Sequence, residues 1–233
     1  MRRIAIGVVV CYVLLLVVLT LPVLGVCFWK DFSSFLELLG LGKEVFSSVV
    51  YWGFIGVLAL CHVVLLCIPL RIARERPVAK RHIWIPVAVT GFLLGCLVFG
   101  LYVAGLEALK LEDSNPHIIE FAFLIGGAVW LLWAVIFYLR TRQRDAKSIV
   151  QLQSQWLFKS SLLALLIAVP MHIVARSRDE CCAGYETFVA LAFGIPIMLM
   201  SLGPGVFFLY ANRWKQLQPK PKGDAPNDTP MDN

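Results

Sequence analysis

The chain has 233 residues, of which 59% are hydrophobic and 15% charged, and its mean hydropathy is +0.79. A soluble domain is typically about 45–50% apolar and about 25% charged, and one of this size could not bury so much apolar surface in a single core. The composition therefore excludes a soluble enzyme, a nucleic-acid-binding domain and a disordered chain. The formal net charge of +6 has to be interpreted at a lipid bilayer, with no nucleic-acid partner.

Six stretches are long and apolar enough to cross a bilayer, which takes about 20 residues. Because the apolar runs are continuous and do not alternate with polar residues, they predict helices rather than barrel strands. The predicted spans are residues 4–28, 45–70, 84–108, 118–139, 157–175 and 187–211. The first run follows Arg2 and Arg3 but is too long for a signal peptide, so we expect it to be retained. The predicted fold class is all-α, a polytopic six-helix transmembrane domain over residues 1–215.

The Lys and Arg residues are distributed unevenly over the two sides of these spans. With a cytoplasmic N-terminus, all but five of the 21 basic residues fall on the cytoplasmic side. The five on the outer side are Lys30, Lys43, Lys110, Arg176 and Arg178. Because the loops are short, the positive-inside rule predicts an N-in/C-in topology.

Two segments outside the spans carry their own predictions. Residues 31–42 are too short and too polar to span, but apolar side chains such as Phe35 share one helical face, and Ser34 and Glu37 have the spacing of a capping box. We expect a short interfacial helix on the outer surface there. Residues 216–233 contain several prolines and almost nothing apolar, which predicts a disordered cytoplasmic tail.

The third span contains a series of small residues at four-residue spacing. Gly91 and Gly95 form a GxxxG pair, and Gly100 continues the series. Small side chains let helix backbones approach closely inside a bilayer. We expect these glycines to make a contact within the chain, with a homodimer seam as the alternative.

Three of the seven cysteines are predicted to lie at the outer side. Cys27 ends the first span, and Cys181 and Cys182 are adjacent in the last outer loop. On an oxidising side, Cys27 could pair with either of the two in a structural disulfide, which is the leading hypothesis. One alternative is a soft-metal site, for example for Cu(I), to which Met171 and His172 would contribute. Another is cycling between dithiol and disulfide, although the chain has no C-x-x-C motif. No other cofactor is predicted.

Ionisable and helix-breaking residues within the spans indicate where a cavity could lie. Glu120 and His172 share the outer level, where they either line a polar cavity or reach headgroup water. Pro196 and Pro204 should kink or partly unwind the last span, and irregular backbone at membrane depth survives only inside protein or along a cavity. His62 lies at a different depth from His172, so the two histidines cannot sandwich one haem.

Neither a phosphate-binding loop nor the motifs of serine hydrolases, zinc proteases or dinucleotide-binding proteins occur in the sequence. The run R-S-R-D-E-C-C-A-G, from Arg176 to Gly184, precedes a last span with S-L-G-P-G-V-F-F-L. Together these runs resemble uncharacterised bacterial multi-pass inner-membrane proteins. The resemblance implies a bacterial source and brings no activity with it.

The leading functional expectation is a non-enzymatic scaffold or accessory subunit with a cysteine-tied outer face in the bacterial inner membrane. Its partners would be the lipid bilayer and either another membrane protein or a second copy of the chain. Two alternatives remain open. The first is a small-solute or ion carrier that uses the last two, proline-broken spans. The second is soft-metal or thiol-redox handling at the loop that contains Cys181 and Cys182.

Overall fold

The computed structural model describes residues 2–28, 34–73, 83–110, 118–141, 146–178 and 184–217. These residues form seven α-helices and no strand. The helices are α1 (Arg2–Cys27), α2 (Phe35–Ser47), α3 (Val49–Ala73), α4 (Trp84–Leu109), α5 (Ile118–Thr141), α6 (Ala146–Arg176) and α7 (Tyr185–Leu217). All except α2 are long and apolar enough to cross a membrane. Within the described ranges, the predicted all-α fold with six helices long and apolar enough to cross a membrane is therefore confirmed.

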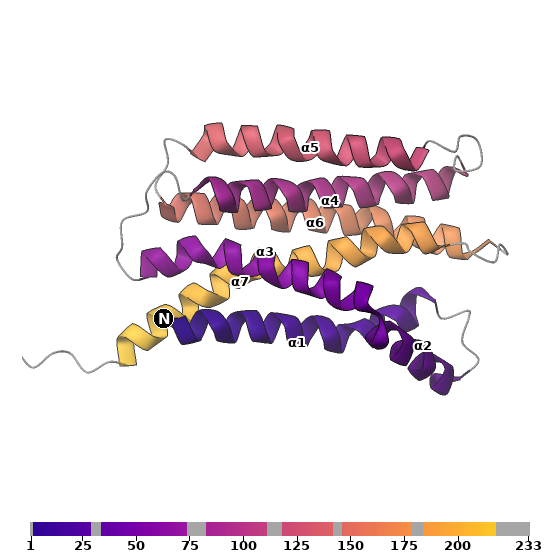
Figure 1. Cartoon of the computed structure of the whole chain (residues 1–233), viewed down its shortest axis with the longest axis horizontal. Coiled ribbons are helices and arrows are strands. Elements are labelled where there is room, and N and C mark those ends of the chain that lie inside the picture. Colours follow the sequence, from indigo (N-terminus) through magenta and orange to yellow (C-terminus); the bar gives the residue numbers. More distant parts are fainter. Residues whose placement is uncertain are drawn as a thin grey trace, which may run out of the picture.

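The six long helices lie side by side in one bundle, with α5 and α1 at opposite edges (Figure 1). Helix α4 packs against α5, α6 and α7, while α1 packs against α2, α3 and α7. Helix α7 runs obliquely across the bundle, from beside α4 and α6 at its start to beside α1 at its end (Figure 1). We call the end of the bundle where α1, α4 and α6 end and α7 begins the Glu107 end.

The buried core follows this oblique path of α7. The main apolar cluster joins side chains of α1, α3, α4, α5, α6 and α7. A second cluster at the Glu107 end consists largely of small residues: Cys27, Ala104, Ala168, Ala190 and Leu191. Because small side chains let backbones approach closely, four helices can meet there. A third cluster, formed by Val8, Leu66, Phe207 and Ala211, joins α1, α3 and α7 at the other end.

The glycines of α4 make close contacts within the chain. A Cβ atom on Gly91 would lie 3.0 Å from the backbone nitrogen of Ala134 in α5, and one on Gly95 would lie 3.1 Å from a carbonyl oxygen of α5. A Cβ atom on Gly100 would lie 3.0 Å from the Cα of Ala190 in α7. The series therefore seats α4 between α5 and α7 rather than leaving a glycine face open.

Helix α6 corrects the prediction of a short span over 157–175, because it begins at Ala146. The added turns are amphipathic: Ile149, Val150 and Gln153 are buried, whereas Gln151 is exposed. A hydropathy window rejects such a segment because its polar residues lower the mean, yet one face of it still packs in the core.

Helices α2 and α7 also differ in extent from the predictions. Helix α2 begins at Phe35 instead of residue 31, and Ser34 occupies its N-cap position without a side-chain capping bond. Helix α7 continues to Leu217, so the first two residues of the predicted tail are helical. The rest of the predicted tail, 218–233, lies outside the described residues.

Candidate functional site

The carboxylate of Glu107 lies in the last turn of α4, beside the start of α7. It is 9% exposed and accepts two backbone hydrogen bonds, one from the N–H of Gly184 and one from the N–H of Thr187 at 2.5 Å. Both N–H groups belong to the start of α7, where a helix has no internal acceptors. A negative charge is also favoured at a helix N-terminus. Glu107 therefore caps α7 from a neighbouring helix.

Arg178 binds the other helix end at this place, the end of α4. Its two terminal nitrogens, Nη1 and Nη2, donate to the carbonyl oxygens of Glu107 at 2.9 Å and Ala108 at 2.6 Å. These carbonyls lie in the last turn of α4, where a positive charge is favoured. Arg178 thus ties the segment after α6 to the end of α4.

His172 of α6 joins the same cluster to α1. Its Nε2 lies 3.0 Å from the carbonyl oxygen of Cys27, and its Nδ1 lies 2.8 Å from Oγ1 of Thr187. Because a carbonyl only accepts, Nε2–H must donate to Cys27. The Thr187 hydroxyl also lies 3.2 Å from the carbonyl oxygen of Gly184. Both ring nitrogens of His172 are therefore engaged in contacts between helices.

Position 184 requires a glycine for two reasons, its backbone conformation and the side chains around it. It has φ +96°, a conformation that L side chains rarely adopt. A Cβ atom there would overlap the Arg176 side chain and would lie 3.2 Å from Cε1 of His172. The guanidinium of Arg176 lies 5.5 Å from the centre of the Phe28 ring, in cation–π range. We call Glu107, His172, Arg178, Gly184 and Thr187 the helix-end cluster.

The cysteine and metal predictions concern this end of the bundle. Cys27 is a buried free thiol, and the described part of the chain contains no disulfide. Cys181 and Cys182 lie outside the described residues, so their pairing with Cys27 stays a prediction. Among the residues that are described, no group of three or more His, Cys, Asp or Glu could hold a metal. Met171 packs with the small-residue core cluster, and both His172 ring nitrogens face hydrogen-bond partners.

Three of the four residues singled out as possible cavity residues, His172, Pro196 and Pro204, line different openings in the described part of the chain. His172 borders a groove between α1, α6 and α7, whereas Pro196 lines a pocket between α1, α3 and α7. Pro204 lines a void of only about 10 Å³ between α3, α6 and α7, and the Glu120 side chain lies outside the described residues. Helix α7 stays helical through Pro196 and Pro204, which excludes the partial unwinding, while the kink that was the other expected outcome stays a prediction.

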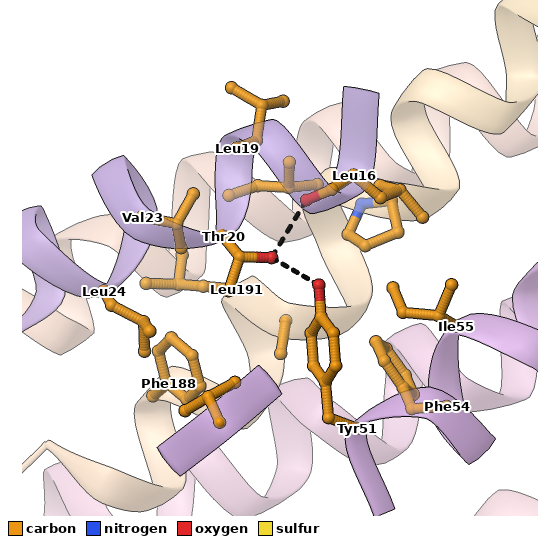
Figure 2. Close-up of a pocket in the computed structure, with 14 residues that line it drawn as sticks. Leu16, Leu19, Thr20, Val23, Leu24, Tyr51, Phe54, Ile55, Phe188 and Leu191 are labelled. Atoms are coloured by element: carbon orange, nitrogen blue, oxygen red, sulfur yellow. Dashed lines mark hydrogen bonds between the residues drawn. The ribbon is translucent and has the colours of Figure 1, made fainter. Parts of the chain in front are cut away.

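The pocket beside Pro196 has a volume of about 210 Å³ and almost entirely apolar walls. Figure 2 shows Tyr51 reaching from α3 to Thr20 of α1, with their oxygens 2.8 Å apart. Since the Thr20 hydroxyl donates to the Leu16 carbonyl at 2.9 Å, Tyr51 is the donor to Thr20. The hydroxyls in the wall thus satisfy one another.

Sequence reasoning singled out His172 as a site residue, but it gave no such role to Glu107, Arg178, Gly184 or Thr187. The available signal was local. The acidic and cysteine-containing run 179–182 is followed by Gly184, shortly before the predicted last span, and Thr187 comes three residues after that glycine. Only the fold shows that the end of α4 reaches this helix start. No known protein family, no curated protein and no solved structure matches the chain.

Proposed function

We propose that the chain is a non-enzymatic membrane scaffold or accessory subunit. One observation carries the proposal: the polar side chains of the helix-end cluster are used to close helix ends and to join helices. Glu107 caps the start of α7, Arg178 caps the end of α4, and His172 links α6 to α1 and α7. A catalytic centre needs an acid, base or nucleophile aimed at a substrate, whereas Glu107 and Arg178 bind backbone groups and His172 faces a carbonyl and a hydroxyl.

The cluster gives a small membrane protein a rigid face. Helices α1, α4, α6 and α7 meet at the Glu107 end through charged and backbone groups, with small residues packed directly beneath them. Hydrogen bonds to charged groups inside a poorly solvated site are stronger than those between neutral groups. An assembly partner could therefore bind the ends of α1, α4, α6 and α7, because the helix-end cluster holds them in one arrangement.

We also propose that the Glu107 end faces outward from the cytoplasm in the bacterial inner membrane, with both termini inside. The supporting observation is charge: Arg2, Arg71, Arg140 and Arg213 all lie at the opposite end of the described helices. Basic residues are retained on the cytoplasmic side of short loops. The resemblance of the double-cysteine loop region to bacterial proteins supports the choice of membrane.

Reporter fusions test this orientation. Alkaline phosphatase, which needs an oxidising compartment, should be active when fused after Lys110 and inactive when fused after Leu217. A fluorescent protein that folds in the cytoplasm should give the reverse pattern. Activity of the phosphatase at the second position and not at the first would overturn the orientation.

Capture from native membranes tests the scaffold. The tagged chain is purified in a mild detergent from cells that naturally produce it, and the companion proteins are identified by mass spectrometry and by capture in the reverse direction. We expect a companion that stays with the wild-type chain and is lost on Glu107→Gln, because the substitution loosens the helix-end cluster. Glu44→Gln, at an exposed position of α2, is the matched control and should retain the companion. Equal recovery with both variants, or no companion at all, would contradict the proposal.

A further inference from the structure

A groove of about 500 Å³ lies between α1 and α7 in the half of the bundle away from the Glu107 end. Leu15, Leu202 and Val206 line it and are exposed on the surface of membrane-spanning helices. The groove therefore opens toward the bilayer, and any ligand would enter it from the lipid.

His62 of α3 forms part of the floor of this groove and is 1% exposed. Neither of its ring nitrogens has a hydrogen-bond partner within the described residues. The Tyr12 ring covers one side, with ring centres 4.5 Å apart. Gly203 lies against the other edge, where a Cβ atom would come within 2.5 Å of Nε2. A neutral imidazole carries one donor and one acceptor, and leaving both buried and unpaired costs free energy that a bound partner would recover.

A second groove, of about 580 Å³, follows the same flank of α1 toward the Glu107 end. The two grooves lie one helical turn apart. On α1 the first ends at Leu15 and the second begins at Leu19. On α7 the same step runs from Leu199 to Ile195. Over residues 191–210, which border both grooves, α7 rises roughly 29 Å at about 1.5 Å per residue. His62 lies beside Gly203 within this stretch, so about 18 Å of largely apolar groove lining leads from it along α7 to Leu191.

The unpaired imidazole of His62 and the two apolar grooves together define the chemistry of the occupant. Its head carries neutral oxygens that accept or donate a hydrogen bond, and its tail is long and apolar. A phospholipid does not fit, since its charged headgroup stays at the interface, whereas His62 lies near the middle of α3. A quinone ring offers carbonyl oxygens to an N–H, its quinol offers hydroxyls to a ring nitrogen, and an isoprenoid tail suits the apolar groove lining.

We propose that the groove between α1 and α7 binds an isoprenoid quinone or quinol, with His62 hydrogen-bonded to a ring oxygen. The assignment concerns binding alone and goes beyond the scaffold function. Gly203 makes the site available, because any side chain at that position would displace the imidazole edge from the groove.

The quinone content of the purified full-length chain tests this. The protein is extracted in detergent from quinone-containing membranes, washed with quinone-free detergent, and its bound quinone is quantified after solvent extraction. The same protein is then titrated with decylubiquinone and followed by native mass spectrometry. His62→Leu replaces the imidazole with an apolar side chain of similar size. Leu202→Trp fills the groove from its lipid-facing wall and leaves residue 62 a histidine.

The wild-type chain should retain quinone at a level approaching one per chain. His62→Leu should weaken decylubiquinone binding by about tenfold, which corresponds to about 1.4 kcal/mol for the lost hydrogen bond. Leu202→Trp should abolish the binding, and Leu209→Trp, on an exposed position of α7 outside the groove, should leave it unchanged. Quinone no higher than in the wash, equal binding by His62→Leu, or a haem absorption band in place of quinone would overturn the proposal.

Discussion

Replacing Glu107 by glutamine removes the negative charge of the helix-end cluster while keeping nearly the same side-chain shape. The carboxylate accepts from two backbone N–H groups, those of Gly184 and Thr187. A glutamine side chain has one acceptor oxygen and one NH₂ group. In either orientation of the amide, one backbone donor therefore faces another donor.

The cost follows from the burial of this group, which is 9% exposed. A hydrogen bond to a charged partner contributes about 1.5–3 kcal/mol, and the charge at the N-terminus of α7 contributes about 0.3–1 kcal/mol more. We expect Glu107→Gln to lower the free energy of unfolding by about 2–4 kcal/mol. For a chain of this size each kcal/mol corresponds to about 2–4 °C in Tm, so the expected decrease is roughly 5–15 °C.

Thermal unfolding in detergent, followed by far-UV circular dichroism, measures this difference. Glu44→Gln removes a carboxylate from an exposed position of α2 and should change the stability by less than about 0.5 kcal/mol. If Glu107→Gln melts at the same temperature as the wild type and as Glu44→Gln, the capping role of Glu107 is wrong.

The remaining predictions use the same assay. Gly184→Ala should cost about 1–3 kcal/mol from its backbone at φ +96°, and retention of the wild-type Tm would contradict that reading. Gly91→Ala should destabilise the chain, because its Cβ would lie 3.0 Å from backbone of α5, while Gly105→Ala meets nothing within 4 Å and should be neutral or stabilising. Tyr51→Phe removes only the donor to Thr20 and should cost less than about 1.5 kcal/mol; a larger loss would show that this pair anchors α1 to α3.

The six spans could be predicted because hydropathy responds to composition, and the bilayer demands about 20 apolar residues in a row. The same averaging placed the start of α6 too late. Gln151 and Gln153 lower the mean hydropathy, yet Gln153 is buried, because burial is decided by the neighbouring helices and not by the local sequence. The glycines of α4 could be recognised as a contact surface, whereas their partners, α5 and α7, depend on the assembled bundle.

The prolines of α7 show why a local signal can mislead. A proline removes one backbone donor and crowds the preceding turn, which predicts a kink or a partial unwinding when the helix is considered alone. In the bundle the chain stays helical, and the carbonyl of Pro196 accepts the Tyr12 hydroxyl at 3.2 Å. The helix-end cluster could not be predicted for a related reason. Glu107 and Thr187 are far apart in sequence, and only the packing of α4 against α7 joins them.

The native mass of the assembly tests the scaffold proposal most directly. The tagged chain is released from the membranes of its own cells in mild detergent and measured intact by native mass spectrometry. The account predicts a species heavier than the 26.1 kDa chain by at least one further protein subunit, and predicts that Glu107→Gln sheds that subunit. A wild-type species at 26.1 kDa, with no protein companion at any detergent concentration that keeps the helices folded, would contradict it.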